Sequence, residues 1–244
     1  HAHRFRSSWT DRPLLMQEMT LSRVSWSEKG WLRRVLVTMT AALLFATCSF
    51  AYAQPSVLVF GDSLSAGYGL DRGEGWVALL RDRLEENDRD VEVVNASVSG
   101  ETTAGGRGRL DAALKRHEPA VVILELGGND GLRALPVETM KANLAAMIEA
   151  SRDSGAKVLL LGMRIPSNYG KRYADQFHQA FVDLAEETEV AFVPFFLEDI
   201  ATDRGNFQND GVHPNAKAQP AMLDAVWPEL APLIDAKATA AAQP

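Results

Sequence analysis

A serine follows an apolar run directly, at a place where a buried strand would have just ended. Ser63 lies in VFGDSLSAGYG (59–69), behind the run SVLVF (56–60). A turn after a core strand is held rigidly by the scaffold, so it suits reactive groups. A serine hydroxyl becomes a nucleophile only when a base takes its proton and donors stabilise the resulting oxyanion. If Ser63 is reactive, the chain must supply these groups elsewhere, whereas the neighbouring Asp62 is expected to be structural.

The chain has five histidines, and one stands out as a candidate base. His1 and His3 fall in an N-terminal segment without helical or strand periodicity. His117 ends a predicted helix, where a cation suits the helix dipole, and His178 is expected to be solvated on an amphipathic helix. His213 remains, because it lies in a loop that follows a predicted strand.

His213 belongs to NDGVHPN, three residues after Asp210. One interpretation is catalytic: the Asp210 carboxylate holds the Nδ1 proton of the imidazole and leaves Nε2 free as a base. The other is structural: Asp210 caps a helix that begins near Pro214. The spacing by itself leaves both open.

Two further loops contain candidate oxyanion donors. Gly100 has no side chain to block its backbone N–H, and Asn129 in GGND carries an amide donor. Each could equally be a turn residue. The functional interpretation rests on the conjunction, because Ser63, Gly100, Asn129 and His213 each follow a different predicted strand.

These loops need a scaffold that brings them together, and the pattern of the chain supplies one. Apolar runs predict strands at 56–60, 91–96, 120–126, 157–163 and 190–195, alternating with predicted helices at 75–86, 104–116, 137–154, 173–188 and 216–234. This alternation predicts an α/β fold, a three-layer α/β/α sandwich with a five-stranded parallel sheet. In such sheets the site lies at the carboxyl ends of the strands.

The four loops resemble the ordered blocks of the SGNH (GDSL) hydrolases: GDSLS at Ser63, the Gly100 loop, GGND at Asn129, and DGVHP at Asp210 and His213. NASVSGETTAGG, MRIPSNYGKRY and DGVHPNAKAQP are similar to the periplasmic thioesterase I, lysophospholipase L1 and arylesterase group of this family. The resemblance implies a flavodoxin-like sandwich, the SGNH hydrolase fold, without cofactor or metal.

The resemblance also implies roles for these residues. Ser63 would be the nucleophile, His213 the general base and then acid, and Asp210 the orienting carboxylate. The Ser63 N–H, the Gly100 N–H and the Asn129 side chain would form the oxyanion hole.

The expected function is that of an exported serine esterase or thioesterase. It would hydrolyse acyl esters, acyl thioesters, lysophospholipids or aryl esters through an acyl-enzyme intermediate. The alternatives are a carbohydrate O-acetylesterase, which uses the same residues, and an inactive module that binds lipid or glycan. Six residues could line an apolar acyl groove or equally pack the sandwich: Leu132, Leu135, Pro136, Ile165, Pro166 and Tyr169.

Residues 1–53 are interpreted as an upstream extension, with a start at Met16 or Met19, followed by a secretory signal. Basic residues precede an apolar run, and Ala51-Tyr52-Ala53 offers an A-x-A cleavage site. An uncleaved membrane anchor over 35–53 is the alternative. Cleavage would remove Cys48, the only cysteine, and release a periplasmic or secreted protein with no stable anchor.

Residues 54–244 are expected to form a single domain with a frayed C-terminal tail from Ala236. Of the 25 basic and 32 acidic residues, seven and three lie in 1–53, so 18 basic and 29 acidic residues remain and give a net charge of −11. This charge makes nucleic acid an improbable partner. We expect a small-molecule ester substrate and a monomeric protein.

Overall fold

A computed structural model of the chain describes residues 54–241, with side chains to residue 235. The predicted secretory signal lies outside the described residues. Among the described residues, no helix combines the length and apolarity needed to cross a membrane.

The core of the fold is a parallel sheet of five strands. The strands are β1 (Ser56–Gly61), β2 (Glu92–Asn95), β3 (Val121–Glu125), β4 (Lys157–Leu161) and β5 (Ala191–Val193), in the spatial order β2-β1-β3-β4-β5. Every residue of β1 and β3 is buried, as is typical of a sheet covered on both faces. This order is that of flavodoxin-like folds, in which ligands bind where the strand order reverses, between β1 and β3.

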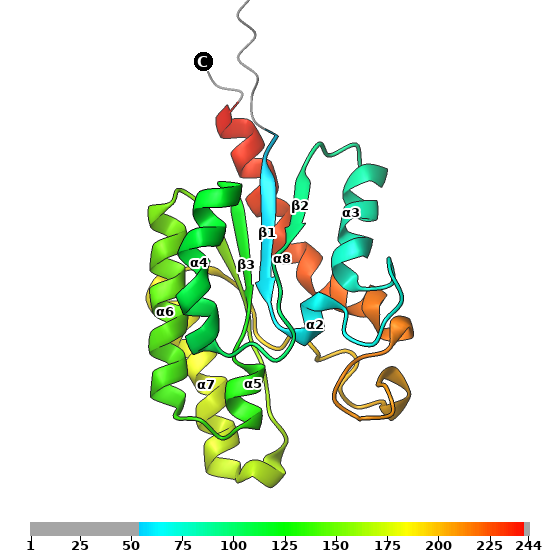
Figure 1. Ribbon diagram of the computed structural model, residues 1–244, viewed down its shortest axis with the longest axis vertical. Helices are drawn as coiled ribbons and strands as arrows, with labels where there is room; N and C mark the ends of the chain where they lie inside the picture. Colours follow the sequence, from blue (N-terminus) through cyan, green and yellow to red (C-terminus); the bar gives the residue numbers. More distant parts are fainter. Residues whose placement is uncertain (1–53, 242–244) are drawn as a thin grey trace, which may run out of the picture. The chain divides into compact units, whose positions relative to one another are not determined.

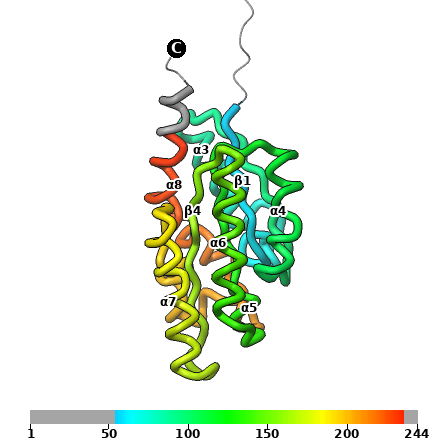
Figure 2. Tube along the Cα trace, turned by 90° about the vertical axis from the view of Figure 1, so that its left-hand side faces the viewer, coloured from blue at the N-terminus to red at the C-terminus, as the bar shows by residue number. Residues whose placement is uncertain are grey.

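Helices cover the two faces of the sheet and complete the predicted three-layer α/β/α sandwich. On one side α4 (Thr103–His117) packs on α6 (Val137–Asp153), and α6 packs on α7 (Lys171–Thr188), so that α6 lies between the other two (Figure 2). On the other side α3 (Trp76–Glu86) packs on α8 (Gln219–Ala241), as Figure 1 shows. The fold class predicted from the sequence is therefore confirmed.

The sequence pattern explains why these helices dock. In α7, Phe177, Phe181 and Leu184 recur at helical spacing, and all three are buried. Phe177 and Phe181 meet edge to face with ring centroids 5.4 Å apart.

Two short helices, absent from the prediction, stand at the carboxyl ends of central strands. Helix α2 (Ser63–Ala66) follows β1, and α5 (Gly128–Leu132) follows β3. In Figure 1 they lie at the end of the sheet to which β1 and β3 point, together with the segment that leads into α8. The polar loops of the sequence therefore gather at this edge.

The C-terminal helix α8 continues to Ala241 and so includes the first part of the low-complexity tail that begins at Ala236. Alanine has the highest intrinsic helix propensity, which explains why the low-complexity tail stays helical. The interior Pro228 and Pro232 do not end this helix.

The packing of α4 predicts opposite effects for two glycines that are two residues apart. A Cβ at Gly106 would lie 2.5 Å from Cδ1 of Leu126, a fully buried core residue, whereas a Cβ at Gly108 would meet nothing within 4 Å. Gly108→Ala should raise the free energy of unfolding by up to about 1 kcal/mol through helix propensity. Gly106→Ala should lower it by overpacking. Thermal unfolding of both variants checks this, and equal shifts in Tm would show that α4 does not pack closely at Gly106.

Candidate active site

The nucleophile candidate begins a capped helix. Ser63 is the first residue of α2, and Asp62 is its N-cap, with Oδ1 accepting a hydrogen bond from the Leu64 N–H at 3.0 Å. Gly67 ends the helix in the left-handed region, with φ of 75°. The turn therefore fixes Ser63 at the carboxyl end of β1, as expected from the position of the strand.

The segment that carries the base candidate is anchored by its own side chains. Gln208 donates from its backbone N–H to the His213 carbonyl at 2.8 Å and from Nε2 to the Tyr68 carbonyl at 2.8 Å. Arg204 donates to the carbonyl oxygens of Gln208 and Asn209. The Tyr68 ring lies against the His213 imidazole, with centroids 4.4 Å apart. Gln208 thus ties this loop to the chain that follows α2.

These two segments bring three predicted residues into contact. His213 Nε2 lies 2.9 Å from Ser63 Oγ, and His213 Nδ1 lies 2.8 Å from Asp210 Oδ2. The Ser63 and His213 side chains come from opposite ends of the domain's sequence. The arrangement is a serine, an imidazole and a carboxylate in series.

The environment of Asp210 sets the tautomer of His213. Oδ1 of Asp210 accepts hydrogen bonds from the backbone N–H groups of His213 and Val212, and these bonds, with the one from the imidazole, lower the pKa of Asp210 to about 2. An ionised Asp210 can only accept, so Nδ1 of His213 is the donor. In the neutral imidazole Nε2 is then an acceptor that faces the Ser63 hydroxyl. Asp210 therefore orients the imidazole and also closes a turn through its bonds to Val212 and His213, whereas the N-cap of the short helix after Pro214 is Asn215.

The amide of Asn129 lies beside the nucleophile turn. Its Nδ2 donates to Asp62 Oδ2 and to the Glu101 carbonyl, both at 3.0 Å. The second bond places the loop of Gly100, the preceding residue, next to Asn129. Gly100 is exposed, with φ of 79°, in the region that favours glycine. Ser63, Asn129 and the Gly100 loop thus converge at one edge of the sheet.

Two buried carboxyl groups lie under the nucleophile turn. Glu125, the last residue of β3, is 0% exposed, and Asp62 is 2% exposed. Oε2 of Glu125 accepts from the Ser65 hydroxyl at 2.7 Å and from the Asp62 N–H at 3.2 Å. Burial raises the pKa of Asp62 to about 6 and raises that of Glu125 well above its ordinary value.

A cavity of about 550 Å³ opens beside Ser63, Asn129 and His213. Three of the six residues proposed for an acyl groove line it, namely Leu132, Ile165 and Pro166. Residues that sequence reasoning missed complete the wall: Met163, Arg164, Phe195, Leu197, Phe207 and Val212. Some of these follow β4 and β5 directly, so their position behind a strand was a signal that could have found them.

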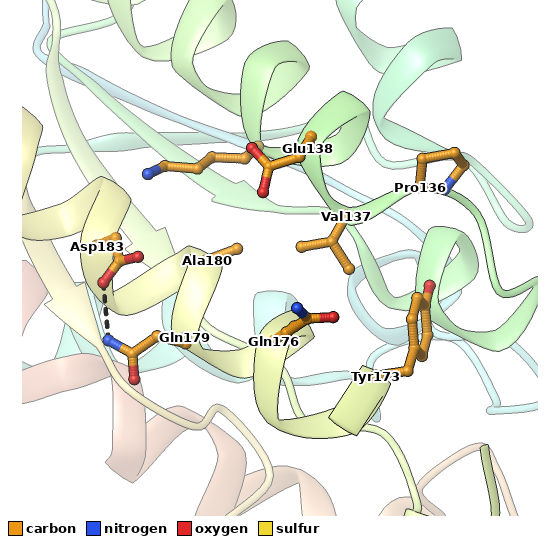
Figure 3. A pocket seen from close by; sticks show the side chains of 9 residues that line it. Pro136, Val137, Glu138, Tyr173, Gln176, Gln179, Ala180 and Asp183 are labelled. Carbon is orange, nitrogen blue, oxygen red and sulfur yellow. Dashed lines mark hydrogen bonds between the residues drawn. The ribbon is translucent and has the colours of Figure 1, made fainter. Parts of the chain in front are cut away.

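Leu135, Pro136 and Tyr169 do not line this cavity, which corrects the expectation for these three. Pro136 instead borders a separate hollow between α6 and α7, together with Tyr173 (Figure 3). The Tyr173 hydroxyl donates to the Leu135 carbonyl at 2.6 Å. The turn after α5 carries Leu135 and Pro136 away from Ser63, because α5 ends at Leu132.

His178 also departs from the expectation of a solvated side chain. It is half-buried, with Nδ1 3.3 Å from the Met163 carbonyl and Nε2 3.0 Å from a guanidinium nitrogen of Arg164. Desolvation lowers the pKa of His178, and the charge of Arg164 lowers it further. His178 therefore contacts two residues of the cavity wall, Met163 and Arg164.

The chain matches the model of one protein family and is similar to several known proteins. The model of the GDSL-like lipase/acylhydrolase family matches residues 59–220. Esterase TesA of Pseudomonas aeruginosa is 48% identical over 203 residues, which cover 83% of this chain and all of that protein. An arylesterase of Vibrio mimicus is 43% identical, covering 79% of this chain and 96% of that protein.

Two further proteins extend the comparison. Thioesterase 1/protease 1/lysophospholipase L1 of Escherichia coli K12 is 40% identical, covering 76% of this chain and 88% of that protein. The crystal structure of the psychrotrophic esterase EstA from Pseudoalteromonas sp., inhibited by monoethylphosphonate, superimposes with a TM-score of 0.71 at 43% identity. The superposition covers 74% of this chain and 98% of the EstA chain.

The two functions of Asp210 can be separated by one substitution. In Asp210→Asn the amide oxygen can still accept from the backbone N–H groups, but the amide NH₂ would face Nδ1 of His213 and favour the wrong tautomer. We expect kcat for a p-nitrophenyl ester to fall by about a thousandfold or more, whereas Tm should fall only modestly because the backbone hydrogen bonds are kept. Steady-state kinetics and thermal unfolding check this. A variant with the wild-type rate would leave Asp210 with its role in the turn only.

Proposed function

Because the chain belongs to the GDSL-like lipase/acylhydrolase family, we propose that Ser63 attacks the carbonyl carbon of acyl and aryl esters and thioesters to form an acyl-enzyme intermediate. The protein is a serine hydrolase of the esterase type. The observation that carries the proposal is the continuous contact from Ser63 Oγ through His213 to Asp210. The inhibition of EstA by a phosphonate is consistent with a nucleophile of this kind in the family.

In the first half-reaction His213 Nε2 takes the Ser63 proton as Oγ attacks the carbonyl carbon. The imidazolium that forms is stabilised by the ionised Asp210. His213 then gives the proton to the departing alcohol or thiol, and the acyl group stays on Ser63. In the second half-reaction water replaces the leaving group, His213 takes a proton from it, and the acid product leaves as the proton returns to Ser63.

The negative oxygen of each tetrahedral intermediate needs donors. As the first residue of α2, Ser63 has a backbone N–H without an intrahelical acceptor. We assign this N–H, the Gly100 N–H and the Asn129 amide to the oxyanion hole. Asn129 would turn the N–H that now faces the Glu101 carbonyl toward the oxyanion, while Asp62 keeps hold of the other.

The cavity favours substrates with an acyl or aryl group larger than acetyl. Its volume of about 550 Å³ exceeds the needs of an acetyl group, and its wall is largely apolar. We therefore place the acyl or aryl part of the substrate against Leu132, Ile165 and Pro166. The function of a carbohydrate O-acetylesterase receives no support from this size.

We further propose that the protein is exported. The support is the basic segment, the apolar run and the Ala51-Tyr52-Ala53 site, all within the segment 1–53. A periplasmic or secreted enzyme would meet lipid esters and aryl esters outside the cytoplasm. We propose a small-molecule ester as the substrate, and the net charge of −11 over residues 54–244 argues against nucleic acid as a partner.

Removal of the nucleophile tests the proposed function. Ser63→Ala should abolish hydrolysis of p-nitrophenyl esters, acyl-CoAs and lysophospholipids and should leave Tm nearly unchanged, because Ser63 is a half-buried turn residue. A fluorophosphonate probe should label the wild type and not the variant. Hydrolysis within about tenfold of the wild type, a loss far smaller than nucleophile removal causes, would contradict the assignment.

A matched pair of leucines tests the acyl site. Leu132 and Leu135 are both 37% exposed, but only Leu132 lines the cavity. Leu132→Ala should lower kcat/KM for p-nitrophenyl octanoate by about tenfold and leave the acetate ester nearly unaffected, because a lost apolar contact costs about 1–3 kcal/mol. Leu135→Ala is the control and should change neither. Equal losses in the two variants would mean that the acyl chain lies elsewhere.

A further inference from the structure

Glu125 is a buried acid that the mechanism above does not use. It is fully buried, and its Oε2 accepts from the Ser65 hydroxyl and from the Asp62 N–H. Its other oxygen, Oε1, is also buried and has no hydrogen-bond partner among the described residues. A Cβ at Gly61, the residue paired with Glu125 across β1 and β3, would lie 2.5 Å from Oε2. A side chain at position 61 would therefore collide with the Glu125 carboxyl group, which occupies the space beside Gly61.

Asp62 links this carboxyl group to the candidate oxyanion hole. Its backbone N–H donates to Glu125, and its Oδ2 accepts from the Asn129 amide at 3.0 Å. Its Oδ1 caps the helix that begins with Ser63. A change at Glu125 would therefore reach Asn129 through Asp62, and the nucleophile turn through both Asp62 and Ser65.

The surroundings favour one proton shared by the two acids. No Lys, Arg or His side chain of the described chain lies within ion-pair distance of either carboxyl group. Asp62 faces His213, whose positive charge would favour its ionised form, together with Asn129 and Glu125. Glu125 faces Asp62 and the Ser65 hydroxyl. Two adjacent buried negative charges without a cation are costly, so one of the two acids stays protonated. Both oxygens of Asp62 accept hydrogen bonds, whereas Oε1 of Glu125 accepts none, so Glu125 is the acid that keeps the proton.

We infer that Glu125 is a positioning residue that works as a neutral carboxylic acid, donating its proton to the Asp62 carboxylate and thereby holding Asp62 in place to orient the Asn129 amide. The two carboxyl groups lie within hydrogen-bond reach of each other. In this arrangement Oε2 remains the acceptor for the two donors described above. Burial raises the pKa of Glu125 well above 4.5, and the neighbouring Asp62 charge raises it further, which agrees with a neutral form at neutral pH. The inference rests on the proposed esterase function for its kinetic consequences only.

Two substitutions distinguish a neutral acid from a charged one. Glu125→Gln supplies an amide that accepts and donates at the same places, so kcat at pH 7 should stay within about threefold of the wild type. Glu125→Leu removes all three hydrogen bonds, and kcat should fall by about tenfold to a hundredfold with KM little changed. Asn129→Ala gives the comparison, because removal of one oxyanion donor typically costs about a hundredfold or more.

A control separates positioning from stability. Ser151 is fully buried in α6 and donates to the Met147 carbonyl at 2.7 Å, outside the cavity. Ser151→Ala should lower Tm and leave kcat unchanged. If Glu125→Leu does not fold, Glu125→Gln still decides the question through the measurements below.

The proton itself can be observed without any activity. At pH 8, infrared spectroscopy of the wild type should show the carbonyl stretch of a protonated carboxyl group, and Glu125→Gln should lack it. The folded-state pKa of Glu125 is raised, so the stability contributed by its neutral form is present below 4.5 and is lost as pH rises through the folded-state pKa. The Tm of Glu125→Gln relative to the wild type should therefore rise with pH.

The outcomes separate the two proposals. Inactive wild-type enzyme on every ester would overturn the proposed function, while the infrared band would still test Glu125. A band that persists in Glu125→Gln, or a kcat loss in Glu125→Gln equal to that in Glu125→Leu, would overturn the role of Glu125 as a neutral acid.

Discussion

The site depends on the parallel pairing of β1 with β3. Their register sets Gly61 opposite Glu125, so the two strands end at the same level. The loops that follow them therefore place Ser63 and Asn129 near each other. A slip of one residue would turn every side chain of one strand to the other face of the sheet, and Glu125 with it. The hydrogen bond from Asn129 to Asp62 could not survive this change. The catalytic geometry is thus a consequence of a strand register fixed by the core.

The two aspartates of the site show how strongly environment separates equal groups. Asp62 is buried, and desolvation raises its pKa to about 6. Asp210 is largely solvated and accepts two backbone N–H groups and the imidazole, which lower its pKa to about 2. Such divergence between neighbouring acids is typical of sites in which each acid has its own task. In the proposed mechanism Asp62 would support the oxyanion donor Asn129, and Asp210 would support the base His213.

Their linkage to stability has opposite signs. The stabilisation from Asp210 is present above its ordinary pKa of 3.8 and is lost as pH falls toward 2. The stabilisation from neutral Asp62 is present below 3.8 and is lost as pH rises through about 6. At neutral pH the fold therefore tolerates an ionised carboxylate under the nucleophile turn. The hydrogen bonds from Leu64 and Asn129 offset part of the desolvation cost of the ionised Asp62 carboxylate. The proposed role of Asp62 in orienting Asn129 gives a reason for an ionised group at this position.

The sequence by itself determined the order of strands and helices, because near-continuous apolar runs and helical spacing such as Phe177, Phe181 and Leu184 report burial directly. It also pointed to Ser63, Gly100, Asn129 and His213, because residues behind different strands of a parallel sheet meet at one edge, while the role of Asp210 came from the family resemblance. Only the tertiary structure decided that Leu132 lines the cavity and Leu135 does not, since both follow the same strand in the same apolar stretch. It alone revealed the pair of Glu125 and Asp62, because in the sequence Glu125 is one polar residue in a strand. Its contacts come from Asp62 and from Ser65 of α2, sixty residues or more earlier in the chain, and no local pattern records them.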